Sequence, residues 1–165
     1  MTKTQAPIWP TPGKRHLTPY ERTHLARYQL AEAIAQAHPH QPVEYLTGRV
    51  EFAGLVLSLT PATLIPRPET EELVNEACLW LTSRQQQKSL STLRVLEIGT
   101  GCGAIALALE QNCPAPLAIT ATDLSPEALQ VARLNLRRFH SQRICLRKND
   151  LLDQWPKEEK YDLLI

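Results

Sequence analysis

An apolar run that ends in a loop with glycine at every second position is the feature that most constrains this fold. Residues 95–98 (Val-Leu-Glu-Ile) lead into residues 99–104 (Gly-Thr-Gly-Cys-Gly-Ala), and a helical pattern follows. Glycines in such a loop allow backbone N–H groups to approach a ligand where a Cβ would collide. The order of strand, glycine loop and helix predicts a site for a nucleotide-type cofactor.

Strand and helix patterns alternate from this point to the last residue. We expect strands at 93–98, 117–122 and 144–147, helices at 104–111 and 126–138, and a final apolar run at 161–165. Ser125 and Pro126 supply an N-cap and a first helical position. The alternation predicts an α/β fold, a Rossmann-like, doubly wound parallel sheet with helices on both faces, of which the first four strands are present.

The first half of the chain has a different organisation. Residues 1–17 resemble a tail, a capping box at residues 18–21 predicts one helix to about His38, and residues 50–59 predict a β-hairpin about Ala53-Gly54. A helix over 69–83 and a Gln/Ser-rich linker over 83–91 follow. We expect three parts: 1–40 as a tail plus helix, 41–92 as hairpin and linker helix, and 93–165 as the cofactor-binding sheet.

Composition limits the classes of partner. Lys plus Arg number 18 against 17 Asp plus Glu, a formal charge of +1, so no affinity for nucleic acid is expected. The four cysteines lack the paired spacing of a zinc site, and we expect no metal. No apolar run reaches the roughly 18 residues of a membrane span, and no secretory leader is visible. A soluble, cytoplasmic protein without a membrane partner is expected.

The glycine loop alone does not identify the cofactor, because it fits both S-adenosylmethionine enzymes and the dinucleotide fingerprint. Asp123, about twenty residues beyond the loop, is placed to accept hydrogen bonds from ribose hydroxyls; its alternative role as a helix cap already falls to Ser125. Glu97 favours the methyl donor, because a carboxylate near the loop would repel a pyrophosphate. Residues 149–151 (Asn-Asp-Leu) fit either an adenine contact or an ordinary strand-ending turn.

Three segments outside the loop carry a closer resemblance. They are residues 41–48 (Gln-Pro-Val-Glu-Tyr-Leu-Thr-Gly), residues 51–52 (Glu-Phe) and residues 61–71 (Pro-Ala-Thr-Leu-Ile-Pro-Arg-Pro-Glu-Thr-Glu). With them the chain, from about residue 17 to 165, resembles the release-factor glutamine methyltransferase family, which methylates a glutamine side-chain amide. General methyltransferases share the glycine loop but not these segments.

The resemblance implies S-adenosylmethionine as cofactor and a peptide-chain release factor as protein substrate. It also implies that Phe52 lines the slot for the substrate glutamine. The residues expected at the cofactor are Glu97, Gly99, Thr100, Gly101, Cys102, Gly103, Asp123, Asp150 and Leu151. Glu51, Arg67 and Glu69 are interpreted as structural, Arg67 as an ion-pair partner and Glu69 as a first-turn helix acid.

The chain departs from the family pattern in two places. Only one helix of the family's N-terminal helical domain is expected, and the chain ends at Ile165, just before the position of the family's Asn-Pro-Pro-Tyr motif. The resemblance implies that this motif orients the amide, so we expect no catalytic residue within the chain, and weak or no methyl transfer by this fragment.

Four alternatives remain open. The motifs do not separate a release-factor enzyme from one that acts on a ribosomal-protein glutamine. An adenine-specific DNA methyltransferase is disfavoured by the balanced charge and by residues 66–70. A non-catalytic S-adenosylmethionine-binding module and a dinucleotide oxidoreductase complete the set.

Overall fold

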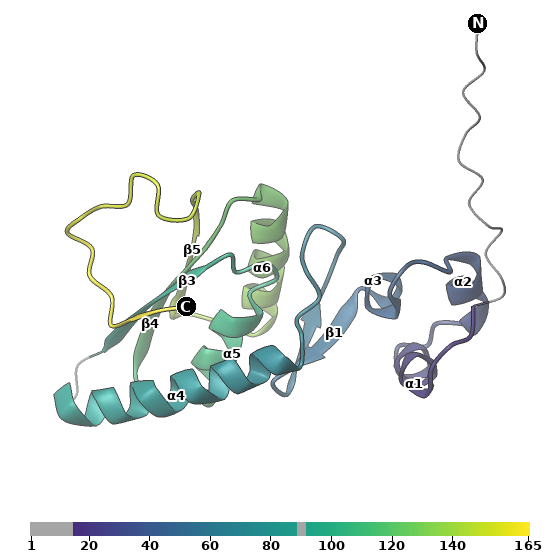
Figure 1. Cartoon of the computed structure of the whole chain (residues 1–165), viewed down its shortest axis with the longest axis horizontal. Helices are drawn as coiled ribbons and strands as arrows, with labels where there is room; N and C mark the ends of the chain where they lie inside the picture. The colour runs from purple at the N-terminus through teal and green to yellow at the C-terminus, as the bar shows by residue number, and fades with distance from the viewer. Residues whose placement is uncertain (1–14, 89–91) are drawn as a thin grey trace, which may run out of the picture. The chain divides into compact units, whose positions relative to one another are not determined.

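The structure, a computed structural model, describes residues 15–88 and 92–165 (Figure 1). The chain divides into two compact units, Met1–Thr47 and Gly48–Ile165. The expected tail falls mainly on residues 1–14, outside the described residues. No helix in the described part of the chain is long and apolar enough to cross a membrane.

The first unit contains short helices around a small apolar cluster. They are α1 (Pro19–Arg27), α2 (Glu32–Ala37) and α3 (Val43–Thr47). The capping box is confirmed: the Glu21 N–H donates to Thr18 Oγ1 at 3.2 Å, and the Thr18 N–H donates to Glu21 Oε2 at 2.7 Å. Leu25 and Val43, each 1% exposed, belong to the buried cluster on which the helices pack.

The expectation of one continuous helix to His38 is wrong, because the chain turns after α1. Gln29 adopts a left-handed conformation, with φ at 57°. The Leu30 N–H then donates to the Leu25 carbonyl at 2.9 Å, and the Gln29 N–H donates to the Ala26 carbonyl at 3.1 Å. These two bonds form a Schellman motif, which ends the helix. The sequence signal was hidden because glutamine occupies the position that glycine usually takes.

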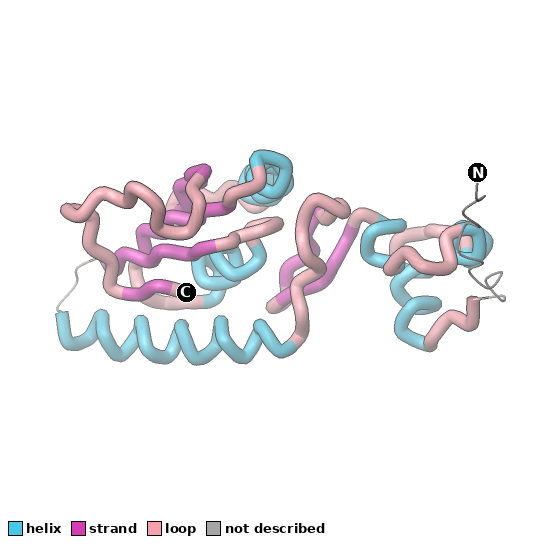
Figure 2. The backbone as a smooth tube through the Cα atoms, turned by 45° about the horizontal axis from the view of Figure 1, so that its top comes forward, coloured by secondary structure: helices cyan, strands magenta, loops and turns pink. Residues whose placement is uncertain are grey.

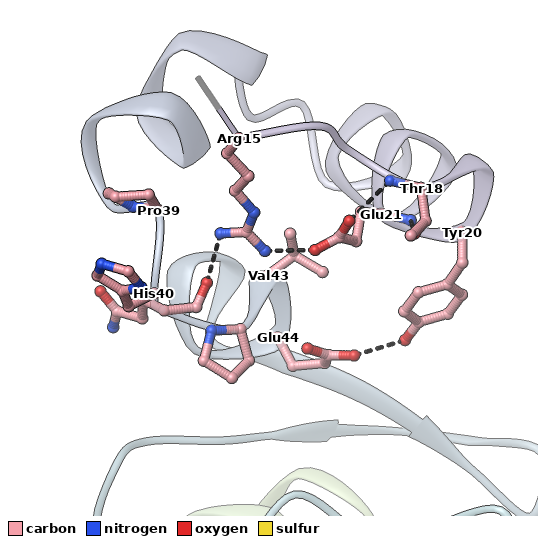
Figure 3. Close-up of a pocket in the computed structure, with 10 residues that line it drawn as sticks. Arg15, Thr18, Tyr20, Glu21, Pro39, His40, Val43 and Glu44 are labelled. Atoms are coloured by element: carbon pink, nitrogen blue, oxygen red, sulfur yellow. Dashed lines mark hydrogen bonds and ion pairs between the residues drawn. The ribbon is translucent and has the colours of Figure 1, made fainter. Parts of the chain in front are cut away.

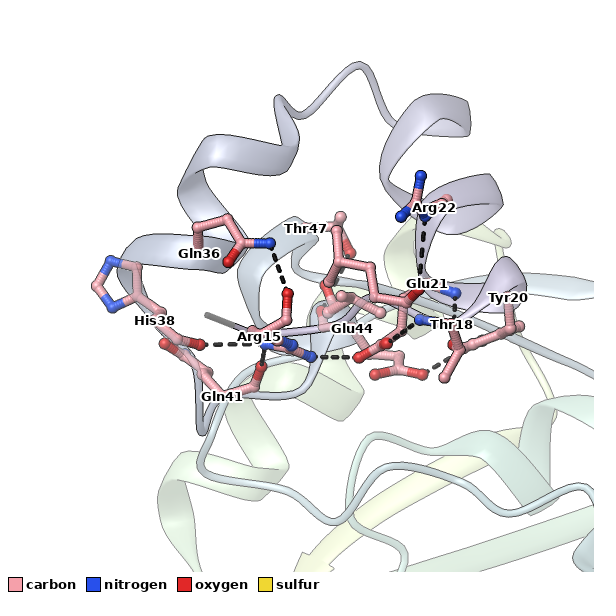
Figure 4. A network of polar contacts seen from close by, with 12 residues as sticks. Arg15, Thr18, Tyr20, Glu21, Arg22, Gln36, His38, Gln41, Glu44 and Thr47 are labelled. Carbon is pink, nitrogen blue, oxygen red and sulfur yellow. Dashed lines mark hydrogen bonds and ion pairs between the residues drawn. The ribbon is translucent and has the colours of Figure 1, made fainter. Parts of the chain in front are cut away.

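Arg15 connects the start of the first unit to the segment before α3 (Figure 4). Its guanidinium forms an ion pair with Glu21 and donates to the carbonyl oxygens of His38, at 3.1 Å, and Gln41, at 2.7 Å. The Gln36 side chain in turn donates to the Arg15 carbonyl at 2.8 Å. Because it joins three segments, this network has a structural role.

A surface pocket beside Arg15 contains a second polar pair (Figure 3). The Tyr20 hydroxyl donates to Glu44 Oε1 at 2.8 Å. Partial burial, and next the Glu44 carboxylate, raise the pKa of Tyr20 to about 12, so the phenol remains a neutral donor at physiological pH.

The second unit begins with the predicted hairpin. Strands β1 (Arg49–Phe52) and β2 (Leu55–Ser58) pair antiparallel, with Phe52 opposite Leu55. The turn residues Ala53 and Gly54 have φ of 47° and 80°, as a two-residue type I′ turn requires. The hairpin prediction is confirmed.

Helix α4 (Glu69–Lys88) is longer than predicted. The expectation of a linker from residue 83 is wrong as far as residue 88, and residues 89–91 lie outside the described part. Glutamine and arginine are good helix formers, so the polar run at residues 84–87 continues the helix instead of ending it.

The remaining elements follow the predicted alternation closely. They are β3 (Leu93–Ile98), α5 (Ala104–Asn112), β4 (Leu117–Asp123), α6 (Pro126–Arg138), β5 (Ile144–Lys148) and β6 (Leu163–Leu164). The strands form a parallel sheet in the order β5-β4-β3-β6, visible as adjacent magenta segments in Figure 2. The α/β fold class is confirmed. Because β3 is followed by β4 on one side and β6 lies on the other, the strand order reverses beside β3, where ligands of such sheets bind.

Candidate functional site

The glycine loop leaves the carboxyl end of β3 at this reversal point. Gly99, Gly101 and Gly103 have φ of 75°, 57° and 84°, a left-handed region that side chains with a Cβ rarely adopt. The Thr100 N–H between them donates to the Thr122 carbonyl on β4 at 2.8 Å. The alternating glycines are therefore required by the backbone path.

Space around the three glycines differs from one to the next. A Cβ at Gly103 would meet Leu136 Cδ1 at 3.4 Å and Ala132 Cβ at 3.5 Å, which are ordinary contact distances, so α6 lies against this glycine and its φ, not a lack of space, disfavours a side chain. A Cβ at Gly101 would lie 3.9 Å from the Thr63 Cβ, and one at Gly99 would meet nothing within 4 Å. The loop is thus packed at its helical end and open at its strand end.

Glu97, the last buried residue of β3, is 2% exposed. Its Oε2 accepts a 2.9 Å bond from the Thr100 hydroxyl, and its carboxyl also accepts from the Ala106 N–H in the first turn of α5. Burial, assisted by the nearby charge of Asp123 and opposed by these two hydrogen bonds, raises the pKa of Glu97 to about 7. The carboxyl therefore connects the glycine loop to the helix that follows it.

Asp123 lies at the carboxyl end of β4 and is half-buried. One carboxylate oxygen accepts from the Gly101 N–H at 2.8 Å and the other from the Ser125 N–H at 2.9 Å. Ser125 itself is the N-cap of α6, accepting from the Ala128 N–H at 3.1 Å, as predicted. Each oxygen of an ionised carboxylate has two acceptor sites, so both Asp123 oxygens can accept a further hydrogen bond.

Residues after β5 lie at the same edge of the sheet. The Asn149 N–H donates to the Asp123 carbonyl at 3.1 Å, and the Asn149 side chain donates to the carbonyl oxygens of Leu151 and Asp153. Asp150 is exposed, and Leu151 is 68% exposed with φ of 48°. The structure therefore places Asn149 beside Asp123, and the exposed residues Asp150 and Leu151 follow directly in the chain.

Cys102 is 2% exposed, and burial raises the pKa of its thiol to about 12. A neutral, buried thiol is a poor nucleophile. Among the described residues, no group of three or more His, Cys, Asp or Glu side chains could hold a metal ion.

Phe52 lies on β1 and is 1% exposed. Glu69 is in the first turn of α4, where an acid favours the helix dipole, as expected, while Glu51 and Arg67 are exposed. The hairpin tip is fixed at Ala53, whose N–H donates to Glu71 at 3.0 Å and whose carbonyl accepts from Asn112 at 3.2 Å.

Sequence reasoning missed Asn135. This side chain on α6 is fully buried and hydrogen-bonds both to the hairpin and to the glycine loop. A signal was available, because Asn135 is the polar member of an otherwise apolar helical stripe that includes Ala128, Ala132 and Leu136.

Comparison with known proteins agrees with this geometry. Residues 95–165 match a family described as a methyltransferase domain. The N-terminal domain of human METTL16, solved in complex with SAH, superposes with a TM-score of 0.51 at 22% identity, covering 67% of this chain and 45% of that one. The fold is that of the class I S-adenosylmethionine-dependent methyltransferases.

Curated relatives are more similar in sequence. The chain is 41% identical over 152 residues to the release factor glutamine methyltransferase of Koribacter versatilis, covering 92% of this chain and 50% of that protein. It is 40% identical to the Bordetella pertussis protein of the same name, covering 89% and 51%. The chain spans about half the length of these relatives. The predicted resemblance is confirmed: the chain is a relative of the release factor glutamine methyltransferases.

Proposed function

We propose that this chain binds S-adenosylmethionine at the carboxyl edge of β3, β4 and β5, and that it serves methylation of a glutamine side-chain amide in a peptide-chain release factor. The observation that carries the proposal is the pairing of the glycine loop with Asp123, together with the similarity to the named relatives. A cytoplasmic location, where release factors act, is part of the same proposal.

The chemistry of the site fits this cofactor. S-adenosylmethionine carries a sulfonium and an ammonium group and, when bound, supplies an electrophilic methyl group. Two carboxyl groups, Glu97 and Asp123, lie close enough for the charge of one to raise the pKa of the other. Such a site favours a cationic ligand and disfavours the pyrophosphate of a dinucleotide.

Distinct roles follow for the residues at this edge. Asp123 would accept hydrogen bonds from the ribose hydroxyls with its remaining acceptor sites. Asp150 would reach the adenine amino group, and the exposed Leu151 would cover the ring. Gly99 would allow the backbone to approach the ligand. Glu97, because it is buried, would act through the loop by holding Thr100 and the start of α5.

The substrate side of the proposal concerns an amide nitrogen, which is a poor nucleophile because its lone pair is delocalised into the carbonyl. Efficient transfer therefore depends on orientation of the NH₂ group. Phe52 is proposed to form the wall of the glutamine slot. Its buried position on β1 suits a rigid wall that packs behind the slot.

A genetic experiment tests the proposed activity in the protein as it exists. In a strain lacking the gene, we expect the release-factor peptide that contains the modified glutamine to lose one methyl group by mass spectrometry. The complete gene should restore the methyl group, and the complete gene with Asp123→Asn should restore it poorly.

The same samples distinguish the alternatives. Loss of a methyl group from a ribosomal-protein glutamine, or from adenine in DNA, with an unchanged release factor would contradict the proposal. No change in any of the three would also contradict it.

A further inference from the structure

Asn135 makes three hydrogen bonds to backbone groups from two different segments. Its Oδ1 accepts from the Ser58 N–H at 2.7 Å, and its Nδ2 donates to the Ser58 carbonyl at 2.9 Å and to the Cys102 carbonyl at 2.9 Å. Its amide thus imitates a strand partner for the end of β2. The same amide group also fixes the centre of the glycine loop.

This side chain is 0% exposed, so no water can replace its bonds. Loss of the amide would leave three buried backbone groups without partners. The two Nδ2 hydrogens suffice for the two acceptors, so the bonds to Ser58 and Cys102 form at the same time.

Other contacts support a junction at this point. The segment after β2 reaches the loop, since a Cβ at Gly101 would lie 3.9 Å from the Thr63 Cβ. Helix α6 packs directly on Gly103 through Ala132 and Leu136. The tip of the hairpin, in contrast, is held by the side chains of Glu71 on α4 and Asn112 on α5, which bond to Ala53 and not to the glycine loop.

We propose that Asn135 is a positioning residue that couples the hairpin carrying Phe52 to the glycine loop, so that order in one segment is transmitted to the other. The importance of this coupling for methyl transfer rests on the proposed function. In that function the hairpin would form the slot for the substrate glutamine, and the loop would hold the methyl donor. The coupling itself is a property of the folded chain and does not require the ligand.

Amide hydrogen exchange of the chain without ligand tests the coupling. We compare Asn135→Asp, whose buried carboxyl retains the shape and in its neutral form can donate only one of the two bonds, with Glu71→Ala, which releases only the hairpin tip. In Asn135→Asp, exchange should accelerate about tenfold both at Leu57–Leu59 and at Gly101–Gly103, as loss of about one hydrogen bond predicts. In Glu71→Ala, only the hairpin amides should accelerate.

A merely structural role would give a different pattern. If Asn135 contributed only to global stability, exchange would rise uniformly, including at Ile119 and Ala121 in the middle of β4. Uniform acceleration, unchanged exchange at the loop, or the same loop effect in Glu71→Ala would overturn the proposal. If Asn135→Asp does not fold, Asn135→Ser, which keeps one hydroxyl donor, replaces it in the same comparison.

A second measurement uses S-adenosylhomocysteine and the unaltered chain. Binding should slow exchange at β2 as well as at the loop, and Asn135→Asp should bind about tenfold more weakly because fewer molecules have the competent loop. Protection confined to the loop would overturn the coupling. Absence of binding would contradict the proposed function, and the ligand-free exchange experiment would still decide the coupling.

Discussion

Replacement of Glu97 by glutamine offers the sharpest test of how the glycine loop is stabilised. Glu97 is 2% exposed, and burial raises its pKa from an ordinary 4.5 to about 7. The folded chain therefore holds this proton more tightly than the unfolded chain. The resulting stabilisation is fully present below pH 4.5 and is lost as the pH rises through 7.

The magnitude follows from the size of the shift. A rise in pKa from 4.5 to about 7 corresponds to about 3 kcal/mol of unfolding free energy, lost between pH 4.5 and 8. Glutamine stays neutral over this range, and its amide can still meet Thr100 and the Ala106 N–H. The free-energy difference between Glu97→Gln and the unaltered chain should therefore shift by about 3 kcal/mol in favour of the variant.

Urea denaturation of both proteins at half-unit pH steps from 4.5 to 8 measures this difference. Contributions from titrating groups that do not interact with Glu97 cancel when the two curves are subtracted. A difference that stays constant across the range would refute the reasoning, because it would mean that Glu97 is ionised alike in the folded and unfolded chains.

Three further substitutions test particular contacts. Gly54→Ala should cost about 1 to 2 kcal/mol in urea denaturation, because φ is 80° although nothing lies within 4 Å of the new Cβ. Gly103→Ala, at φ of 84°, should cost about the same, because its Cβ would lie at ordinary contact distance from Leu136 and Ala132. A much larger cost at Gly103 would contradict the argument that backbone conformation, and not space, selects glycine there. Ser125→Ala should lower the thermal unfolding midpoint through loss of about 1 kcal/mol of N-cap stabilisation, and an unchanged midpoint would argue against the cap.

The α/β half of the fold could be predicted almost residue by residue because its signals are local. Alternating apolar strands, the glycine loop and the Ser125-Pro126 cap each define an element within a few residues. The break after α1 could not be read in this way, because Gln29 stands at the left-handed position where glycine is the usual signal. The bonds that end the helix are donated by the Gln29 N–H to Ala26 and by the Leu30 N–H to Leu25. The extension of α4 was missed because a polar run resembles a linker.

The same distinction between local and long-range signals applies to the candidate site. Asp123 was recognisable from its distance to the loop, and the structure places its carboxylate on Gly101. The burial of Glu97 and the three bonds of Asn135 depend on contacts between segments up to 77 residues apart. A single sequence does not show which distant segments come together. Long-range polar contacts of this kind are set by packing and not by local pattern.

Calorimetric titration of the chain with S-adenosylmethionine and, separately, with NAD tests the central claim most directly. We expect saturable binding of S-adenosylmethionine, no binding of NAD, and an affinity about 10 to 100-fold weaker in Asp123→Asn, as loss of hydrogen bonds to a charged group predicts. Binding of NAD without S-adenosylmethionine, or of neither ligand, would contradict it.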